Sequence, residues 1–397
     1  MDAHDGLSAG APTPVGLYDP HVHGTICDPF PIYRELRQKH PAYHNPDRHF
    51  WAVSRYADVQ RAVRNWQAFS NAHGVDFDVA AGFFGPGDFQ ESDPPKHERL
   101  RDIFKIPFAQ KSVQELETTI RKQVDALLDP LIEKGSGDFV QEVASQLPLA
   151  VIFGLLGYTS DGAYLAPLMY DILARVPGDP SLPERALQAR RRLQDYAAHA
   201  AGERRKRPQD DLMSVIVAAE GAGHVAPEEI PGMCLLLLLA GWMTTSMLVS
   251  NAIWLLATHR DQRATLAERP DQIPNALEEV LRFDAPVMHS LRVLTEAVEL
   301  HDEAIPAGEN VLLIWASANR DETRWPDGDT FDITRELKRN VAFGDGIHHC
   351  LGAPLARLEG RILVERVIAL RPDFEVGEPE RYPGATLRGM SKLPIAF

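Results

Sequence analysis

The sequence predicts a mainly α-helical fold with a minor β component, in a single large domain. Between residues 96 and 283, most segments space their apolar residues by three and four positions, which is typical of amphipathic helices. Alternating apolar and polar residues occur mainly towards the two ends of the chain and indicate short strands. No linker, low-complexity block or fixed-period repeat divides the 397 residues. We therefore expect one domain over residues 25–397, after a mobile N-terminal tail over residues 1–24.

The individual elements follow from these local patterns. In the first half of the chain we expect a helix at 28–43, a strand and a helix within 49–65, a long loop at 71–92, and helices at 97–108, 113–132, 139–156, 188–203 and 212–220. In the second half we expect helices at 235–251 and 271–283, short strands within 298–317, an irregular stretch at 318–340, a glycine-rich loop at 343–352, a helix at 353–370 and short strands within 383–397.

Composition narrows the class of protein. Hydrophobic residues make up 44% of the chain and charged residues 24%, as in soluble globular proteins. The net charge of −15 argues against nucleic acid as a partner, because an acidic surface repels phosphates. The three cysteines, Cys27, Cys234 and Cys350, are too few and scattered for a disulfide framework, which favours a reducing cytoplasm. The first twenty residues lack the pattern of a signal peptide.

An apolar run from Leu235 to Asn251 has the length of a membrane span. No charged residue occurs between Glu229 and Arg260. The flanking segments carry no aromatic belt, and the run lies in the middle of the chain among amphipathic helices. We therefore interpret it as a helix that protein buries on all sides, and we expect no membrane partner.

Cys350 lies in the loop "FGDGIHHCLG", directly before a long helix. Gly344 and Gly346 permit close approach of the backbone to a bulky, flat partner. The N-terminus of the following helix offers partial positive charge and free N–H donors, which favour a thiolate at Cys350. Such a thiolate can be a nucleophile or a metal ligand, and a cysteine at a helix start can also be purely structural. The residues alone leave these alternatives open.

The pattern F-G-x-G-x-H-x-C-x-G over residues 343–352 resembles, at every fixed position, the signature of the haem-thiolate monooxygenases, the cytochromes P-450. The resemblance implies that Cys350 is the axial ligand of the iron of haem b. It also implies that Phe343 shields the thiolate and that His348 contacts a haem propionate. Gly344 and Gly352 would border the same cofactor.

This resemblance extends from about Asp28 to the C-terminus. It implies a single cytochrome P-450 fold, with haem buried between a long distal helix and the helix that follows the cysteine loop. The whole of residues 25–397 would then form one haem-thiolate monooxygenase domain.

Two further groups of residues resemble the family. Glu279 and Arg282 lie three apart and share a helix face, so on their own they could be an exposed ion pair. In the family this pair is buried, braces the cysteine loop and is joined by an arginine, which the segment "FDITR" places at Arg335. Burial would make the network costly to break, by roughly 3–5 kcal/mol per lost partner.

Haem brings two carboxylates, and charge-assisted bonds from Arg and His suit them. The segment "DPPKHERLR" resembles the family's early helix, with His97 and Arg101 on one face. Arg292, in "HSLRVL", resembles the arginine that follows the helix of Glu279 and Arg282. The resemblance assigns His97, Arg101 and Arg292 to the haem propionates.

In the family, the apolar helix crosses the distal face of the haem. Ala240 and Thr244 lie one turn apart, and a threonine at mid-helix tends to bond to the carbonyl four residues earlier. The resemblance gives Thr244, beside Gly241 and Thr245, the role of steering protons to dioxygen. The position before the threonine usually holds Asp or Glu, but here it holds Met243, which cannot relay a proton.

The resemblance implies insertion of one oxygen atom of O2 into an organic substrate, with reduction of the other atom to water. Because Met243 replaces the acid, we keep three haem chemistries open. Protons can arrive through water held by Thr244 or Thr245, which we favour. Alternatively, hydrogen peroxide can be used directly, or the chain can act like the nitric-oxide-reducing relatives. A non-enzymatic haem sensor would not need Thr244.

The chain contains no flavin or nicotinamide motif, so we expect electrons from a separate ferredoxin and its reductase. On the family's usual geometry, basic residues near the cysteine loop form the docking face: Lys338, Arg339 and Arg357. The substrate should be a small hydrophobic molecule, because mostly apolar residues are expected to line its pocket. They are Phe83, Phe84, Phe89, Leu236, Leu237, Ala240, Trp242, Val287, Met288, Leu291 and Met390.

Overall fold

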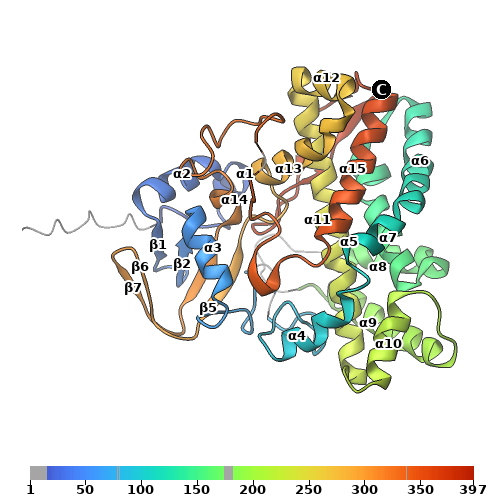
Figure 1. Ribbon diagram of the computed structural model, residues 1–397, viewed down its shortest axis with the longest axis horizontal. Helices are drawn as coiled ribbons and strands as arrows, with labels where there is room; N and C mark the ends of the chain where they lie inside the picture. Colours follow the sequence, from blue (N-terminus) through green and yellow to red (C-terminus); the bar gives the residue numbers. More distant parts are fainter. Residues whose placement is uncertain (1–15, 78, 80, 174–181, 337) are drawn as a thin grey trace, which may run out of the picture.

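The longest helix, α11 (Ile230–Thr258), runs through the middle of the helical part of the molecule (Figure 1). The computed structural model describes residues 16–77, 79, 81–173, 182–336 and 338–397. Most of this chain is helical, which confirms the predicted mainly α fold with a minor β component. α11 packs against α7 (Gln146–Leu156), α9 (Glu184–Lys206), α13 (Ile273–Phe283) and α15 (Ala353–Leu370).

The segment Pro227–Thr258, which includes α11, is long and apolar enough to cross a membrane by length and composition. In the folded chain, however, 78% of its most apolar window is buried inside the protein. This burial confirms the predicted core helix, because a helix that is apolar on every side needs protein on every side.

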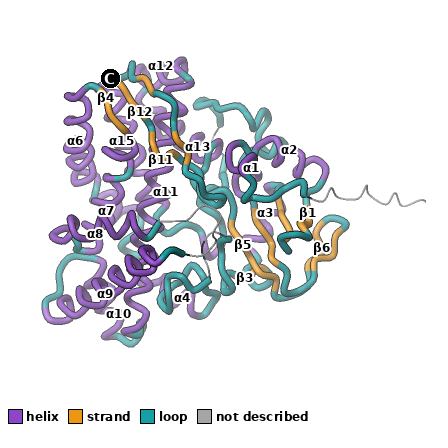
Figure 2. The backbone as a smooth tube through the Cα atoms, turned by 180° about the vertical axis from the view of Figure 1, so that it is seen from behind, coloured by secondary structure: helices purple, strands orange, loops and turns teal. Residues whose placement is uncertain are grey.

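The other helices surround α11 or cover the sheet (Figures 1 and 2). They are α1 (His23–Cys27), α2 (Phe30–Lys39), α3 (Tyr56–Arg64), α4 (Lys96–Arg101), α5 (Gln110–Glu115), α6 (Glu117–Lys134), α8 (Gly162–Asp171), α10 (Leu212–Gly221), α12 (Arg260–Glu268) and α14 (Trp315–Ala318). A π-helical turn at Val140–Ala144 precedes α7, and a 3₁₀ turn at Gly346–His348 precedes α15.

The main sheet lies to one side of the helical body and joins distant parts of the sequence (Figure 1). Its strands are ordered β1 (Ala42–Asn45), β2 (Phe50–Val53), β8 (Asn310–Leu313), β5 (Ser290–Leu294) and β3 (Phe69–Ser70). β2 and β8 are parallel, and the other pairs are antiparallel. Smaller sheets comprise β4 (Ser136–Asp138), β12 (Pro394–Ala396) and β9 (Glu375–Val376); β6 (Val298–Leu300) and β7 (Glu303–Ile305); and β10 (Glu380–Arg381) and β11 (Met390–Lys392).

The folded body begins earlier than the expected boundary at residue 25. Residues 1–15 of the expected tail lie outside the described residues. Tyr18, however, is fully buried, and its backbone N–H donates to the Tyr43 hydroxyl at 3.3 Å. Its ring makes edge contacts with those of Tyr33 and Phe50. These aromatic contacts hold the segment against the sheet.

Four helices were not expected from the sequence. α1 is a short helix in which only Thr25 is buried. α8 lies in a stretch for which no element was predicted, because Gly162 and Pro167 interrupt its pattern. α12 is mostly polar, with only Arg263 and Leu266 buried. α14 follows β8 where a strand was predicted to continue. The expected loop at 71–92 is confirmed: its described residues form no helix or strand.

Candidate active site

The cysteine loop is fixed to the end of α3 and to itself. Gly346 has a φ of 66°, and a Cβ there would come within 2.8 Å of Val63 O, so a side chain has no room. The Cys350 N–H donates to Phe343 O at 2.8 Å, which closes the loop. Asp345 Oδ1 accepts from the Gly346 N–H at 2.8 Å.

α15 begins directly after the loop and points its N-terminus at the sulfur of Cys350. The backbone N–H groups of Gly352 and Ala353 hydrogen-bond to this thiol. Burial raises the pKa of Cys350, while these bonds and the charges of Arg101 and Arg357 act in the opposite direction. Burial outweighs these contributions, so the pKa of the Cys350 thiol lies above its usual value in the protein without a metal ion.

Four groups that can carry positive charge gather beside this loop: His97, Arg101, Arg292 and His348. The rings of His97 and His348 have centroids 4.2 Å apart. Both ring nitrogens of His97 and Nε2 of His348 are buried without a hydrogen-bond partner among the described residues. Arg292 is 4% exposed, and its Nη1 donates to two neutral oxygen atoms of its own strand, at 2.7 and 2.6 Å. Arg101 donates to the carbonyl oxygen of His349.

These groups disfavour one another's charge. Burial lowers the pKa of His348 to about 2, with further lowering by Arg292, His97 and Arg101. Burial and Arg101 lower the pKa of His97 to about 4, and burial lowers that of Arg292 to about 10. A ligand with two carboxylates would supply the negative charge that this cluster lacks.

The middle of α11 is less covered than its ends. Ala240 is exposed although residues 232–239 are buried, and Met243 and Thr244 are partly exposed. These three residues share one helix face. Thr244 Oγ1 donates to Ala240 O at 2.7 Å, the back-bond expected for a threonine at mid-helix. An exposed alanine at the middle of a central helix indicates open space beside it.

Comparison with known proteins decides the family. A family model described as Cytochrome P-450 matches residues 29–380. The chain belongs to the cytochrome P-450 family. It is therefore a P-450 monooxygenase, and P-450 proteins bind haem through a cysteine thiolate.

Similar P-450 proteins match along nearly their whole length. The Vitamin D(3) 25-hydroxylase of Pseudonocardia autotrophica is 37% identical, with 93% of this chain and 94% of the relative covered. The P-450 monooxygenase PikC of Streptomyces venezuelae is 34% identical, with 94% and 91% covered. The crystal structure of CYP109E1 from Bacillus megaterium with testosterone has a TM-score of 0.86 at 30% identity, with 93% and 97% covered.

The residues of this P-450 fit a haem. Unpartnered ring nitrogens of His97 and His348 and the buried charge of Arg292 match propionate carboxylates. The Cys350 sulfur at the start of α15 matches an iron ligand, since a bound metal ion removes the proton of a thiol. The exposed face at Ala240 is consistent with a flat group beside α11.

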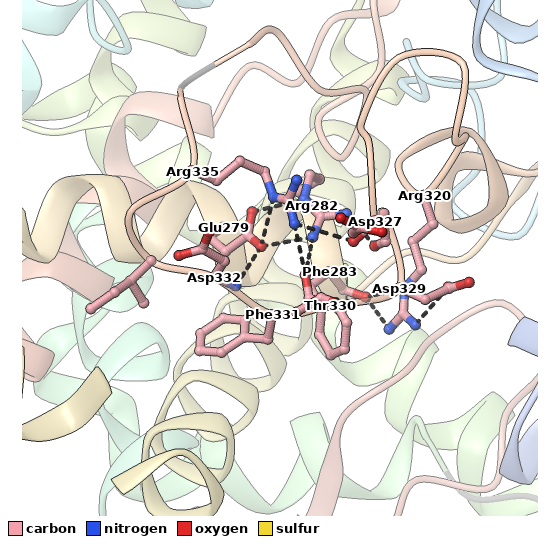
Figure 3. A network of polar contacts seen from close by, with 12 residues as sticks. Glu279, Arg282, Phe283, Arg320, Asp327, Asp329, Thr330, Phe331, Asp332 and Arg335 are labelled. Atoms are coloured by element: carbon pink, nitrogen blue, oxygen red, sulfur yellow. Dashed lines mark hydrogen bonds and ion pairs between the residues drawn. The ribbon is translucent and has the colours of Figure 1, made fainter. Parts of the chain in front are cut away.

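The network of Glu279, Arg282 and Arg335 is formed as the sequence indicated (Figure 3). Glu279 and Arg282 are each 3% exposed and form two hydrogen bonds of 2.7 Å. Arg335 Nε lies 3.3 Å from Glu279 Oε1. The arginines also donate to backbone carbonyl oxygens of residues 319–330, among them Gly328 O, 2.7 Å from Arg282 Nη1.

The network reaches the cysteine loop through a residue that the sequence did not reveal. Arg282 Nη1 donates to Asn319 O at 3.1 Å, and Asn319 Oδ1 accepts from the Val341 N–H at 2.7 Å. Val341 lies two residues before Phe343, the first residue of the loop. No local sequence signal marks Asn319, because its role depends on a fold contact between distant segments.

Two predicted residues of α11 face away from Ala240 and Thr244. Trp242 Nε1 donates to Ser145 O at 2.9 Å, so the indole lies on the opposite helix face and its predicted place in the substrate pocket is wrong. A Cβ at Gly241 would contact Ile152 of α7 at 3.5 Å, so Gly241 serves helix packing and is not at the open face.

Met288 and Leu291, two further residues predicted for the substrate pocket, are buried. Both belong to the buried cluster around Tyr18, Tyr33 and Phe50 on the outer side of the main sheet. Successive strand residues point to opposite faces, so Leu291 faces away from Arg292. Their place in the substrate pocket stays a prediction.

The other predicted pocket residues are apolar and at least partly covered. Leu236 and Leu237 lie about one turn before Ala240 on α11, and Val287 forms an isolated bridge with Leu387. The largest core cluster contains or borders Phe83, Phe84, Phe89, Leu236, Leu237 and Met390.

Basic residues surround the cysteine loop as expected, and some are held in place. Arg339 and Arg64 both pair with Asp345, at 2.5 and 2.7 Å. Burial would raise the pKa of Asp345, but the Gly346 N–H and these two arginines hold it below its usual value. Arg357 pairs with Glu278 and lies over the ring of Phe343, 4.5 Å from its centroid. Arg64 was not predicted, because it is distant in sequence.

Proposed function

We propose that this P-450 binds haem b with the Cys350 sulfur as axial ligand of the iron. The Cys350 sulfur at the start of α15, beside buried histidine nitrogens that have no hydrogen-bond partner among the described residues, is the observation that carries this proposal. Haem supplies the iron centre at which dioxygen is activated. His97, Arg101, Arg292 and His348 then bind its propionates.

The chain's own residues would shape both sides of this cofactor. On the sulfur side, Phe343 excludes water, and Arg357 stacks on its outer face. Glu279, Arg282 and Arg335 position the loop through the preceding segment. On the other side, the small side chain of Ala240 leaves room for the cofactor. Thr244 and Thr245 offer hydroxyl groups that can hold water next to Met243.

The proposed reaction inserts one oxygen atom of O2 into a small hydrophobic substrate and reduces the other to water. Apolar side chains at Phe83, Leu236 and Leu237 support an apolar pocket. Two similar proteins support the same substrate class by their names, since one hydroxylates vitamin D(3) and the other was crystallised with testosterone.

A ferredoxin and its reductase would supply the electrons, because the sequence contains no flavin or nicotinamide motif. Lys338, Arg339 and Arg357 near the cysteine loop support docking of an acidic protein there. We place the enzyme in the cytoplasm, which fits its three free cysteines.

The decisive test is the spectrum of the reduced protein with carbon monoxide. Wild type should show the red-shifted Soret band of thiolate ligation, and Cys350→Ser should lose it while retaining a helical circular dichroism spectrum. Cys234→Ser, at a buried cysteine in α11, is the matched control and should keep the band. A wild-type band typical of a neutral nitrogen ligand would contradict the assignment of Cys350.

A further inference from the structure

Arg190 of α9 carries a charge that no acidic group among the described residues balances. Its Nε is buried without a hydrogen-bond partner among these residues, and its guanidinium forms no ion pair with them. Burial lowers its pKa, and no neighbouring carboxylate raises it. Other arginines of this helix pair with carboxylates, for example Arg204 with Asp211 at 2.6 Å. A partly buried cation without a counter-charge is costly for a protein and often serves a function.

The aromatic ring of Phe83 positions this guanidinium. Cζ of Arg190 lies 5.2 Å from the centroid of the ring, and Phe83 is 5% exposed. Stacking on a ring attracts a cation, but it leaves the N–H donors at the edge of the guanidinium without acceptors. A positioned guanidinium whose donors lack acceptors is suited to a carboxylate, which accepts two parallel hydrogen bonds.

Arg190 lies where α9 borders the loop over residues 71–92. One turn further along α9, Gln194 Nε2 donates to Phe84 O at 3.0 Å. The side chains of Ala186 and Leu193, which flank Arg190 on the helix surface, are buried. The charge is therefore at the edge of the buried face of α9, between this helix and the loop.

The same loop contacts the beginning of α11. A Cβ at Gly232 would lie 2.9 Å from Phe84 O. Gly232, Leu236 and Ala240 follow one another at intervals of four residues and form one stripe of α11. Leu236 is buried, and Ala240 is exposed at the open face. The stripe thus leads from the loop beside the unpaired charge to the open face, over about 12 Å for eight residues.

We infer that Arg190 binds a carboxylate of the substrate, and that the substrate is an apolar carboxylic acid which lies along this stripe. The inference rests on the proposed function and narrows its substrate class. The apolar body of the acid contacts Leu236, and its far end reaches Ala240. Arg190 determines specificity, because a neutral molecule of the same shape leaves the guanidinium without a counter-charge.

The position of the charge also determines which carbon is oxidised. The carboxylate is held at the loop end of the stripe, about 12 Å along α11 from Ala240. An extended acid therefore presents carbons remote from its carboxylate at the open face, and the carbons next to the carboxylate stay away from it. Without Arg190, the chain can slide along the apolar stripe and present other carbons.

The first test measures binding of dodecanoic acid and of its methyl ester, which has the same chain without the charge. Calorimetry and the spin state of the haem follow binding to the haem-loaded enzyme. Wild type should prefer the acid. Arg190→Gln should raise the Kd of the acid roughly 10- to 100-fold and change that of the ester less than about two-fold. Arg190→Lys keeps the charge and should recover part of the loss.

Arg192→Gln is the matched control, because Arg192 is exposed on the same helix and contacts only the hydroxyl of Tyr164 among the described residues. It should leave both Kd values unchanged. Unchanged binding of the ester shows that the Arg190 variants are folded. Equal Kd values for acid and ester in wild type, or an equal loss of both ligands in Arg190→Gln, overturns the inference.

The second test identifies by mass spectrometry where oxygen is inserted into dodecanoic acid. Wild type should hydroxylate the half of the chain remote from the carboxylate, and Arg190→Gln should spread the product over more positions. Identical product distributions in the two proteins overturn the inference. A wild type that shows the thiolate spectrum but oxidises only neutral compounds also overturns it and leaves the proposed function standing. A wild type without the thiolate spectrum contradicts the proposed function itself.

Discussion

At the scale of single residues, Met243 and Glu359 are the two unusual residues of the helical core. Thr244 is bonded to Ala240 O, and its neighbour Met243 is a thioether that holds no proton. Glu359, on α15, is 2% exposed, and burial raises its pKa from 4.5 to about 8.

Glu359 should make stability depend on pH. Its pKa is about 8 in the folded chain and 4.5 in the unfolded chain, so between about pH 5 and pH 8 only the unfolded state releases the proton. The free energy of unfolding therefore falls as pH rises through this window, by up to roughly 4 kcal/mol. Glu359→Gln removes this loss.

Urea unfolding of wild type and Glu359→Gln at pH 5 and pH 8 measures the effect. The variant should gain stability relative to wild type on going to pH 8. An equal difference at both pH values would show that Glu359 ionises alike in both states. Glu365→Gln provides the comparison for loss of a surface carboxylate.

At the scale of elements, α13 holds the chain segment that leads to the cysteine loop (Figure 3). Glu279 and Arg282 are both 3% exposed, so removing one charge leaves the other buried and unpaired. Loss of this pair should also disturb the cysteine loop. Arg282 donates to Asn319 O, and Asn319 Oδ1 accepts from the backbone N–H of Val341, just before the loop.

Glu279→Gln should lower the free energy of unfolding by roughly 3–5 kcal/mol and weaken haem retention. Glu278→Gln is the matched control on the same helix, because its pair with Arg357 is more exposed, and it should cost less than about 1 kcal/mol. Denaturant unfolding with Soret absorbance follows both quantities. Equal losses in the two variants would contradict a special role for the buried pair.

Local sequence patterns predicted the long helices and the cysteine loop because these depend on spacing along one segment. They did not predict where Trp242 points, because the pocket lies on only one face of α11. Asn319 and Arg64 were missed since their partners are distant in the chain. α12 was missed because a surface helix with few buried residues has little apolar pattern.

At the scale of the whole molecule, the charge is unevenly distributed. The chain carries a net charge of −15, yet basic residues surround the cysteine loop. Asp345 fixes Arg64 and Arg339 there, while the exposed Lys338 forms no ion pair that would hold it and donates only to Arg324 O, at 3.4 Å, among the described residues. A local basic face on an acidic protein can orient an acidic electron carrier as it approaches.

Electron transfer from the ferredoxin should therefore slow as salt rises, because ions screen the attraction. Lys338→Ala should raise the KM for ferredoxin several-fold at low salt and little at high salt. Lys206→Ala, on α9, is the control, and steady-state rates against ferredoxin concentration give both values. The same KM for Lys338→Ala and wild type at low salt would place docking elsewhere.

The way Arg282 and Arg335 bind the irregular stretch has a consequence for sequence divergence. Both arginines contact main-chain carbonyl oxygens, which every amino acid carries, at residues such as Pro326, Asp327 and Thr330. Substitutions at these positions can therefore accumulate while the hydrogen bonds from the two arginines are kept. Gly328 is the exception, because a Cβ there would lie 2.4 Å from Arg320 O. In distant relatives, we therefore expect this segment to keep its backbone conformation and one glycine, even where its other residues have all changed.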